Sequence, residues 1–132
     1  MTFIKTTLMA LGACVTLAAP ASANPANVER VTEGLIAAGI AVELGDQCGS
    51  VSVRRLRGIN FLFGLKGHLE DLGYSNAEID AYIDSRTEKA RLETIARQRL
   101  NSLGARSGDE ASYCAVARTQ IAQDTQIGRL LR

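Results

Sequence analysis

Helical spacing of apolar residues, uninterrupted by proline, is the feature that most limits the folds open to this chain. The 132 residues contain two prolines, Pro20 and Pro25, so the stretch from residue 26 onward lacks the strongest helix breaker. Apolar residues recur there about every three to four positions, and no segment keeps the alternation of a half-buried strand. The pattern predicts an all-α fold, a small bundle of four to five helices.

Cap signals divide this stretch into helical segments. Ser50 is an N-cap candidate, and Ser75 to Glu78 has the S-x-x-E pattern of a capping box. A second S-x-x-E begins at Ser85 and indicates a break or kink, so the helical stretch there is either one helix or two. The expected helices cover 26–45, 51–72, 76–103 in one or two pieces, and 110–123.

The segment 51–72 carries an unusually wide apolar surface. Leu56, Ile59 and Phe63 flank a second row of leucines, so apolar side chains extend well beyond one stripe. Such a helix is expected at the centre of a bundle, in contact with neighbours on two sides. The first helix instead carries a stripe of small residues, which predicts the close approach of another helix: Gly34, Ala38, Ala41 and Gly45.

The first 23 residues have the organisation of a secretory signal peptide. Lys5 precedes a short apolar run, and A-S-A at 21–23 is a small-residue cleavage site. The run is shorter than the roughly 20 residues that a membrane span needs. We expect cleavage after Ala23, a periplasmic location, and a single helical domain over 24–132 without a transmembrane span. The alternative is a lipoprotein signal, in which a lipidated Cys14 anchors the same domain to the membrane.

The charge balance argues against a nucleic-acid partner. The whole chain has a formal net charge of +1, and the predicted signal peptide contributes Lys5 as its single charged residue. The mature chain is therefore expected to carry no net charge. A balanced chain creates no long-range field that attracts nucleic acid or an anionic membrane.

Two cysteines, Cys48 and Cys114, remain once the signal peptide is removed. A cysteine pair in an exported chain of this size is interpreted first as a disulfide. A bridge over so long a loop would stabilise the fold by roughly 4 kcal/mol at most. Free or redox-switching thiols are the alternative, and a metal site is the third. The third is disfavoured because zinc needs three or four ligands and the sole histidine, His68, lacks a C-x-x-C partner.

Arginines form the densest charge of the chain, in the segment that follows Cys48. Arg54 and Arg57 project together from a helix, and two guanidinium groups near a helix start suit a carboxylate or phosphate. The alternative is a solvated helix turn that pairs with Asp46 or Glu43. The closing TQIGRLLR segment carries an apolar triplet that is expected to fold back onto the bundle. We take as candidate interaction residues Arg54, Arg57, Gln126, Ile127, Leu130 and Leu131.

No constellation for catalysis, cofactor binding or metal binding is recognisable. The chain has one histidine, and its serines lack a nucleophile motif. We therefore predict no catalytic, cofactor or metal residues, and we favour a non-catalytic binding or interaction module of the cell envelope, with a partner that the sequence does not identify. A periplasmic stress or chaperone-like helper is the first alternative. A cell-wall enzyme that works through two carboxylates is the second.

Several short motifs, in a fixed order, resemble a known family. They run from the Cys48 segment through Gly73-Tyr74-Ser75 and Ser112-Tyr113-Cys114 to Gln126-Ile127-Gly128. In this order they resemble the DUF5333 proteins over nearly all of residues 24–132. The resemblance implies a small exported protein with a helical fold and no assigned activity. The family often has Glu-Ile-Ala before the last motif, whereas this chain has Gln120-Ile121-Ala122, so a role that needs this carboxylate is in doubt.

Overall fold

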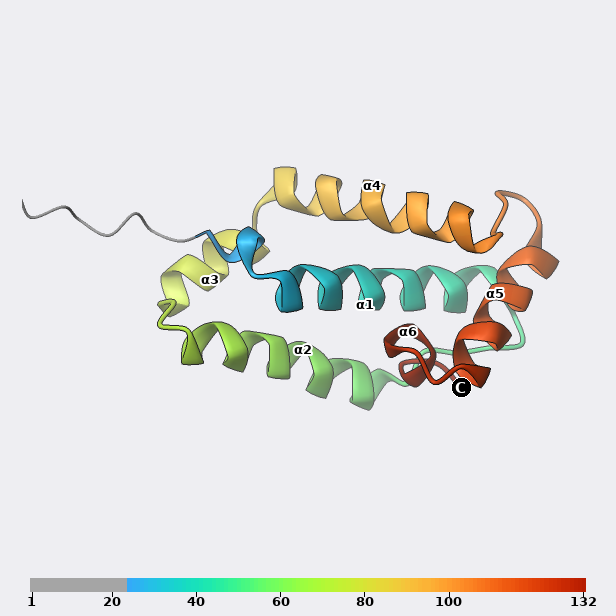
Figure 1. Cartoon of the computed structure of the whole chain (residues 1–132), viewed down its shortest axis with the longest axis horizontal. Coiled ribbons are helices and arrows are strands. Elements are labelled where there is room, and N and C mark those ends of the chain that lie inside the picture. Colours follow the sequence, from blue (N-terminus) through green and yellow to red (C-terminus); the bar gives the residue numbers. More distant parts are fainter. Residues whose placement is uncertain (1–23) are drawn as a thin grey trace, which may run out of the picture.

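Three long helices lie side by side and form the body of the molecule (Figure 1). The structure is a computed structural model that describes residues 24–132; the predicted signal peptide and Cys14 lie outside the described residues. The middle helix is α1 (Glu29–Gln47), with α2 (Arg55–Asp71) on one side and α4 (Arg86–Leu103) on the other. The prediction of an all-α bundle is confirmed.

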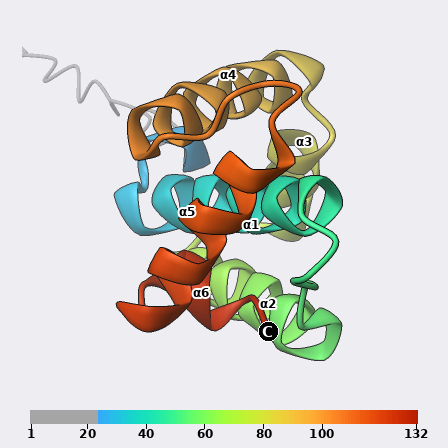
Figure 2. The same ribbon diagram turned by 90° about the vertical axis from the view of Figure 1, so that its right-hand side faces the viewer.

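Shorter elements close the two ends of these three helices. The 3-10 helix η1 (Pro25–Asn27) and α3 (Asn76–Ile83) lie at one end, and α5 (Glu110–Ala122) crosses α1 at the other (Figure 2). The last helix, α6 (Gln126–Arg129), packs against α5 and α1. The C-terminal segment thus folds back onto the bundle, as its apolar residues predict.

The central helix is α1, and this corrects the expectation that segment 51–72 is central. Residues on several sides of α1 are buried: Val31, Gly34, Ile36, Ala37, Ile40, Ala41 and Leu44. By contrast, α2 buries Leu65 and Leu69 alone. The small-residue stripe explains part of this choice, because a Cβ added at Gly34 would lie 2.7 Å from the Leu65 side chain. The predicted close approach of a second helix is therefore real, and α2 is that helix.

The beginning of α2 lies later than predicted. Ser50 was expected to cap a helix from residue 51, but the backbone stays extended until Arg54. The backbone amide of Ser52 donates to the Arg132 carbonyl at 2.8 Å, and that of Arg54 donates to the Leu130 carbonyl at 2.8 Å. These bonds to the end of the chain replace the first turn of the predicted helix.

The stretch 76–103 is two helices, with the break at the second S-x-x-E. Ser85 caps α4 by accepting a hydrogen bond from the Glu88 amide at 3.2 Å. Ser75 and Glu78 form the predicted capping box at the start of α3. A serine that satisfies free helix amides favours a new helix start over continuation of the old one.

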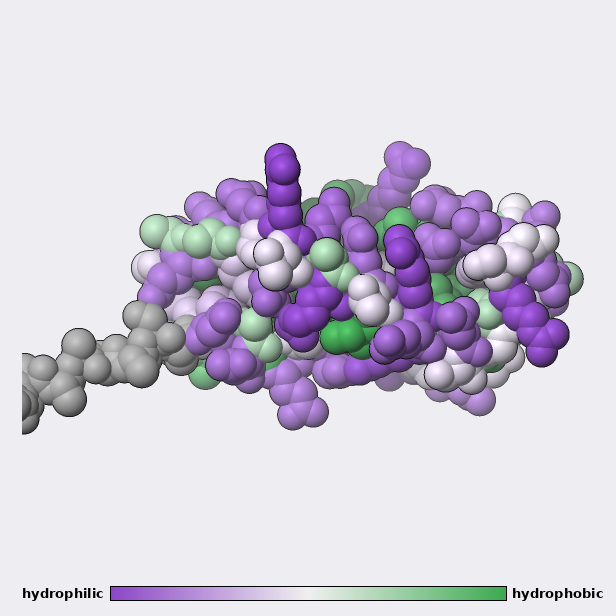
Figure 3. All heavy atoms as spheres, turned by 90° about the horizontal axis from the view of Figure 1, so that it is seen from above, coloured by the Kyte–Doolittle hydropathy of each residue, from purple (hydrophilic) through white to green (hydrophobic). Residues whose placement is uncertain are grey.

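The two helices that flank α1 differ on their outer sides. The face over α4 is dominated by hydrophilic residues (Figure 3), whereas α2 exposes several large apolar side chains. Within residues 24–132, none of the helices is long and apolar enough to cross a membrane.

Candidate functional site

The arginine segment is held in place by the end of the chain. Val53 and Leu131 form an antiparallel bridge, and the Arg132 amide donates to the Ser52 carbonyl at 3.0 Å. One guanidinium nitrogen of Arg57 also reaches the Arg129 carbonyl, at 3.5 Å. Two segments far apart in the sequence thus meet where the candidate arginines lie.

A disulfide fixes the other end of the same segment. Cys48 and Cys114 are bonded, with their Cα atoms 5.1 Å apart, which confirms the predicted bridge. Next to it, the Gly49 amide donates to a carboxylate oxygen of Glu110 at 3.1 Å. The segment between Cys48 and α2 is therefore tied to α5 at its start and to the last residues at its finish.

A basic cleft opens beside this segment, with a volume of about 950 Å³. Four arginines and one carboxylate, that of Asp46, lie on its wall. None of these arginines takes part in a salt bridge within the described residues. We call this hollow the basic cleft; it is lined by Val42, Gly45, Asp46, Ser52, Val53, Arg54, Arg55, Leu56, Arg57 and Arg132.

The chemistry of the basic cleft suits an acidic group. A guanidinium fork donates two parallel hydrogen bonds to a carboxylate or phosphate, which a lysine ammonium cannot do. Arg54, Arg55 and Arg57 are all exposed, so their charges are screened by salt and act over a short range. The cleft can therefore hold the acidic surface of a partner, and binding there is expected to weaken as salt rises.

The other candidate interaction residues do not share this cleft. Gln126 and Ile127 line a separate hollow with Glu33 and Arg99, of about 430 Å³. Leu130 and Leu131 are each 2% exposed and pack in the core, where they fix the end of the chain. An interaction role for these four residues stays a prediction, and the burial of the two leucines places them behind the cleft rather than on it.

Sequence reasoning missed two of the four arginines of the basic cleft, Arg55 and Arg132. Arg55 lies between the two candidate arginines in the sequence, and at 100° per residue on a helix it points away from both. Arg132 joins because its backbone pairs with that of Ser52, 80 residues away in the sequence, and the sequence carries no local signal for this interaction. The density of arginines was the signal that located the rest.

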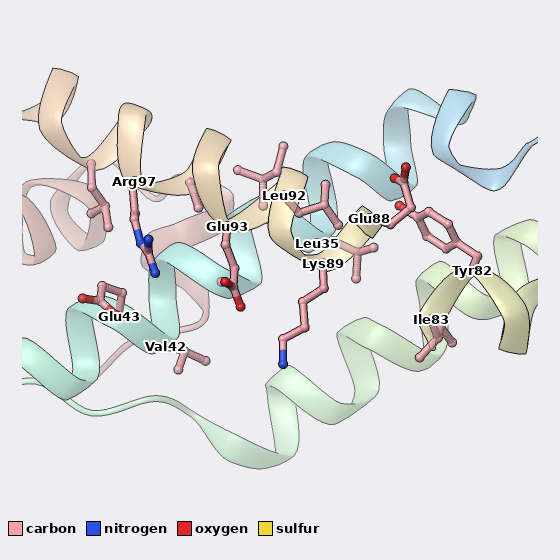
Figure 4. Close-up of a pocket in the computed structure, with 14 residues that line it drawn as sticks. Leu35, Val42, Glu43, Tyr82, Ile83, Glu88, Lys89, Leu92, Glu93 and Arg97 are labelled. Carbon is pink, nitrogen blue, oxygen red and sulfur yellow. The ribbon is translucent and has the colours of Figure 1, made fainter. Parts of the chain in front are cut away.

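A second hollow runs between α1 and α4 and has a volume of about 450 Å³ (Figure 4). Its apolar wall includes Leu35, Val42 and Leu92, and charged side chains surround it. The figure shows Lys89 and Glu93 extending from α4 across this hollow toward α1 and α2. We call it the α1–α4 groove. Val42 lines both this groove and the basic cleft, so the two hollows adjoin on α1.

Three carboxylates, those of Glu43, Glu88 and Glu93, line the α1–α4 groove. Glu88 accepts two hydrogen bonds from Arg91, at 2.9 and 3.1 Å. Elsewhere, a hydrogen bond from Arg99 lowers the pKa of the Glu33 carboxyl, the opposite of the shift that a general acid requires. No group of three or more potential metal ligands occurs among residues 24–132.

Comparison with known proteins places these features in a family. The chain matches, over residues 25–132, a family of unknown function, DUF5333. The protein belongs to the DUF5333 family. The match spans the disulfide, the basic cleft and the C-terminal segment of this DUF5333 member, so it covers the whole candidate site. No curated protein and no solved structure matches the chain.

Proposed function

We propose that this DUF5333 protein is an exported, non-catalytic binding module of the cell envelope that recognises an acidic surface of a partner through its basic cleft. The observation that carries the proposal is that four arginines and a single carboxylate line one cleft. None of these four arginines forms a salt bridge within the described residues. Because like charges repel, holding four arginines in one cleft does not stabilise the fold unless an anion binds among them.

Two features support the proposed periplasmic location. The first 23 residues have the pattern of a signal peptide, and the Cys48–Cys114 disulfide is of a kind that persists in oxidising compartments. An intact mass of the exported protein tests the location and the processing together. A chain that starts at Asn24 would support cleavage of a secretory signal peptide. A diacylated chain that starts at Cys14 would contradict it and favour the lipoprotein alternative.

Crosslinking in the native envelope, followed by mass spectrometry of captured proteins, tests the binding site. The informative variant is Arg54→Glu/Arg57→Glu. The matched control is Arg86→Glu/Arg118→Glu, which reverses the charge at two exposed positions outside the cleft. We expect wild type and control to capture the same partner with an acidic surface, and the cleft variant to lose it.

Capture of the same proteins by all three chains would overturn the arginine assignment. Circular dichroism and thermal unfolding of each variant separate loss of binding from loss of folding. Rising salt offers a second readout, since a partner held by exposed guanidinium groups should be released at high ionic strength.

A chaperone-like helper is the second candidate, because α2 exposes large apolar side chains. Leu56 is 79% exposed and Phe63 is 65% exposed, and such surface is what a holder of unfolded clients needs. This function would be favoured over that of a specific binder if an equimolar amount of the protein suppressed the aggregation of unfolded clients and Phe63→Asp abolished the suppression.

A further inference from the structure

The outer side of α2 is an apolar stripe that no described element covers. Leu56, Ile59 and Phe63 are 79%, 49% and 65% exposed, and on a helix with 100° per residue they lie within about 60° of one another. The buried Leu65 lies on the opposite side, against Gly34 of α1, and Leu69 is buried in the same hydrophobic cluster. Figure 1 shows α2 at the edge of the three-helix layer. We call Leu56, Ile59 and Phe63 the α2 stripe.

The charges at the two ends of α2 have the signs that an isolated helix disfavours. Arg55 and Arg57 occupy the first turn, and Glu70 and Asp71 end the helix. A helix dipole favours acidic residues at the first turn and basic residues at the last. Apart from His68, the basic residue of the last turn, the charges at the two ends of α2 therefore oppose the helix dipole, and a partner helix of opposite polarity would compensate for them.

A second copy of α2, running antiparallel, has that polarity. When two identical helices pack about a two-fold axis centred near Phe63, the N-terminal end of each lies beside the C-terminal end of the other. Glu70 lies in line with the α2 stripe, and Arg55 lies about 40° beyond Ile59, so the two are about 60° apart on the helix. Each Arg55 therefore faces Glu70 of the second copy, while the two Phe63 rings meet near the axis.

The surface beside Phe63 has room for this approach. A Cβ added at Gly67, one turn after Phe63, would meet no atom within 4 Å, so this position is flat and open. Lys66 and Glu70 form an ion pair within α2, with an N–O distance of 3.7 Å. Both side chains are exposed, so this ion pair contributes little and restrains Glu70 only weakly. Glu70 is free to turn toward a second partner.

We propose that the protein forms an antiparallel homodimer through the α2 stripe, with Arg55 of each copy paired to Glu70 of the other. The proposed dimer contact and the basic cleft share Arg55 and Leu56. The two proposals are still tested separately, because Phe63 and Glu70 lie outside the cleft and the partner assignment is tested at Arg54 and Arg57. Dimerisation places two basic clefts on one particle.

Sedimentation equilibrium of the purified, disulfide-bonded protein tests the dimer. We expect a dimer mass for wild type, a monomer mass for Phe63→Asp, and a dimer mass for the control Leu103→Asp. Leu103 is 44% exposed and lies at the end of α4, away from the stripe. Circular dichroism shows whether each variant is folded.

A charge exchange tests the orientation of the two helices. Arg55→Glu and Glu70→Arg should each weaken the dimer about tenfold, and the double variant Arg55→Glu/Glu70→Arg should restore most of that loss. Rescue requires opposite ends of α2 to meet, since a parallel pair would place Arg55 beside Arg55.

Three results would overturn the proposal. The first is a wild-type protein that remains a monomer at its highest soluble concentration. This outcome includes the case in which the monomer uses the α2 stripe to bind unfolded clients. A dimer that persists in Phe63→Asp would use another face. A folded double variant without rescue would remove the antiparallel pairing.

Discussion

The two hydrophobic clusters of this molecule are held together in different ways. The larger cluster includes Leu44, Leu100, Val116 and the buried Leu130 and Leu131, and a disulfide and a backbone bridge cross it. The smaller one contains five buried residues and neither device: Val31, Leu65, Leu69, Ile79 and Tyr82. We call these regions the disulfide end and the α3 end.

The difference shows where the fold needs rigidity. The disulfide end positions the segment between Cys48 and Arg54, which has no helix of its own to hold it and leads into the first turn of α2. The α3 end positions helices that are capped locally, at Ser75 and Ser85. Hydrogen exchange should therefore be faster in α3 than in α5, since regions with few buried contacts open first.

Loss of the disulfide is expected to have the largest effect on stability. In Cys48→Ala/Cys114→Ala the unfolded chain regains the freedom of a loop with a sequence separation of 66 residues. The free energy of unfolding should fall by up to about 4 kcal/mol. Urea denaturation monitored by circular dichroism measures it. A loss below about 1 kcal/mol would mean that the unfolded state is compact without the bridge.

A methyl group at Gly128 should be the next most disruptive change. Its Cβ would collide with the backbone carbonyl of Gln120, so α6 would have to move away from α5. Backbone cannot adjust as a flexible side chain does, and we expect Gly128→Ala to cost about 3 kcal/mol. The tail that holds Arg54 would be displaced as well.

Gly39→Ala is the matched control for this position. Gly39 lies in α1, and an added Cβ would meet no atom within 4 Å. Alanine is the better helix former, so this variant should gain about 0.5–1 kcal/mol. Equal thermal unfolding of the two variants would contradict the close approach of α6 to α5.

At the α3 end, Tyr82→Phe should stabilise the protein. The Tyr82 hydroxyl is buried and makes no hydrogen bond of good geometry among the described residues, although Thr32 and Arg91 are its polar neighbours. Burial raises the pKa of this phenol. Removing a buried, unsatisfied hydroxyl is expected to gain about 1 kcal/mol. Thermal and urea unfolding measure the gain; a loss of stability would show that the hydroxyl is hydrogen-bonded in solution.

Local signals predicted most of the fold. The capping boxes, the helical spacing and the cysteine pair each act within one element or follow from compartment and size, so the sequence indicates them directly. The position of α2 was predicted wrongly, because a wide apolar surface was taken to mean burial on two sides. Its outer residues Leu56 and Phe63 are instead exposed, and small residues made α1 the central helix.

The composition of the basic cleft was beyond the reach of the same reasoning. Arg132 enters it through pairing of its backbone with Ser52, and that pairing also delays the start of α2. Such contacts join residues that are far apart in the sequence, 80 positions in the case of Ser52 and Arg132. No periodicity or cap marks them, since each partner satisfies the other only after the chain has folded.

An ion pair between α1 and α4 should have the smallest effect. Arg99 donates to both carboxylate oxygens of Glu33, and one of these hydrogen bonds is 2.7 Å long. The bond lowers the pKa of Glu33 below its ordinary value of 4.5. Both side chains are more than 40% exposed, so solvent screens the pair, and Glu33→Gln should cost about 0.5 kcal/mol at neutral pH.

The pH dependence of this loss identifies its cause. A carboxyl with a lowered pKa in the folded state stabilises the fold above its unfolded pKa, and that contribution disappears as the pH falls through the folded value. The difference between wild type and Glu33→Gln should therefore be complete above about pH 5 and vanish in acid. Salt should reduce it too. A difference that persists in acid would show that Glu33 acts through packing, and α1 and α4 would then be held together at this point by shape rather than by charge.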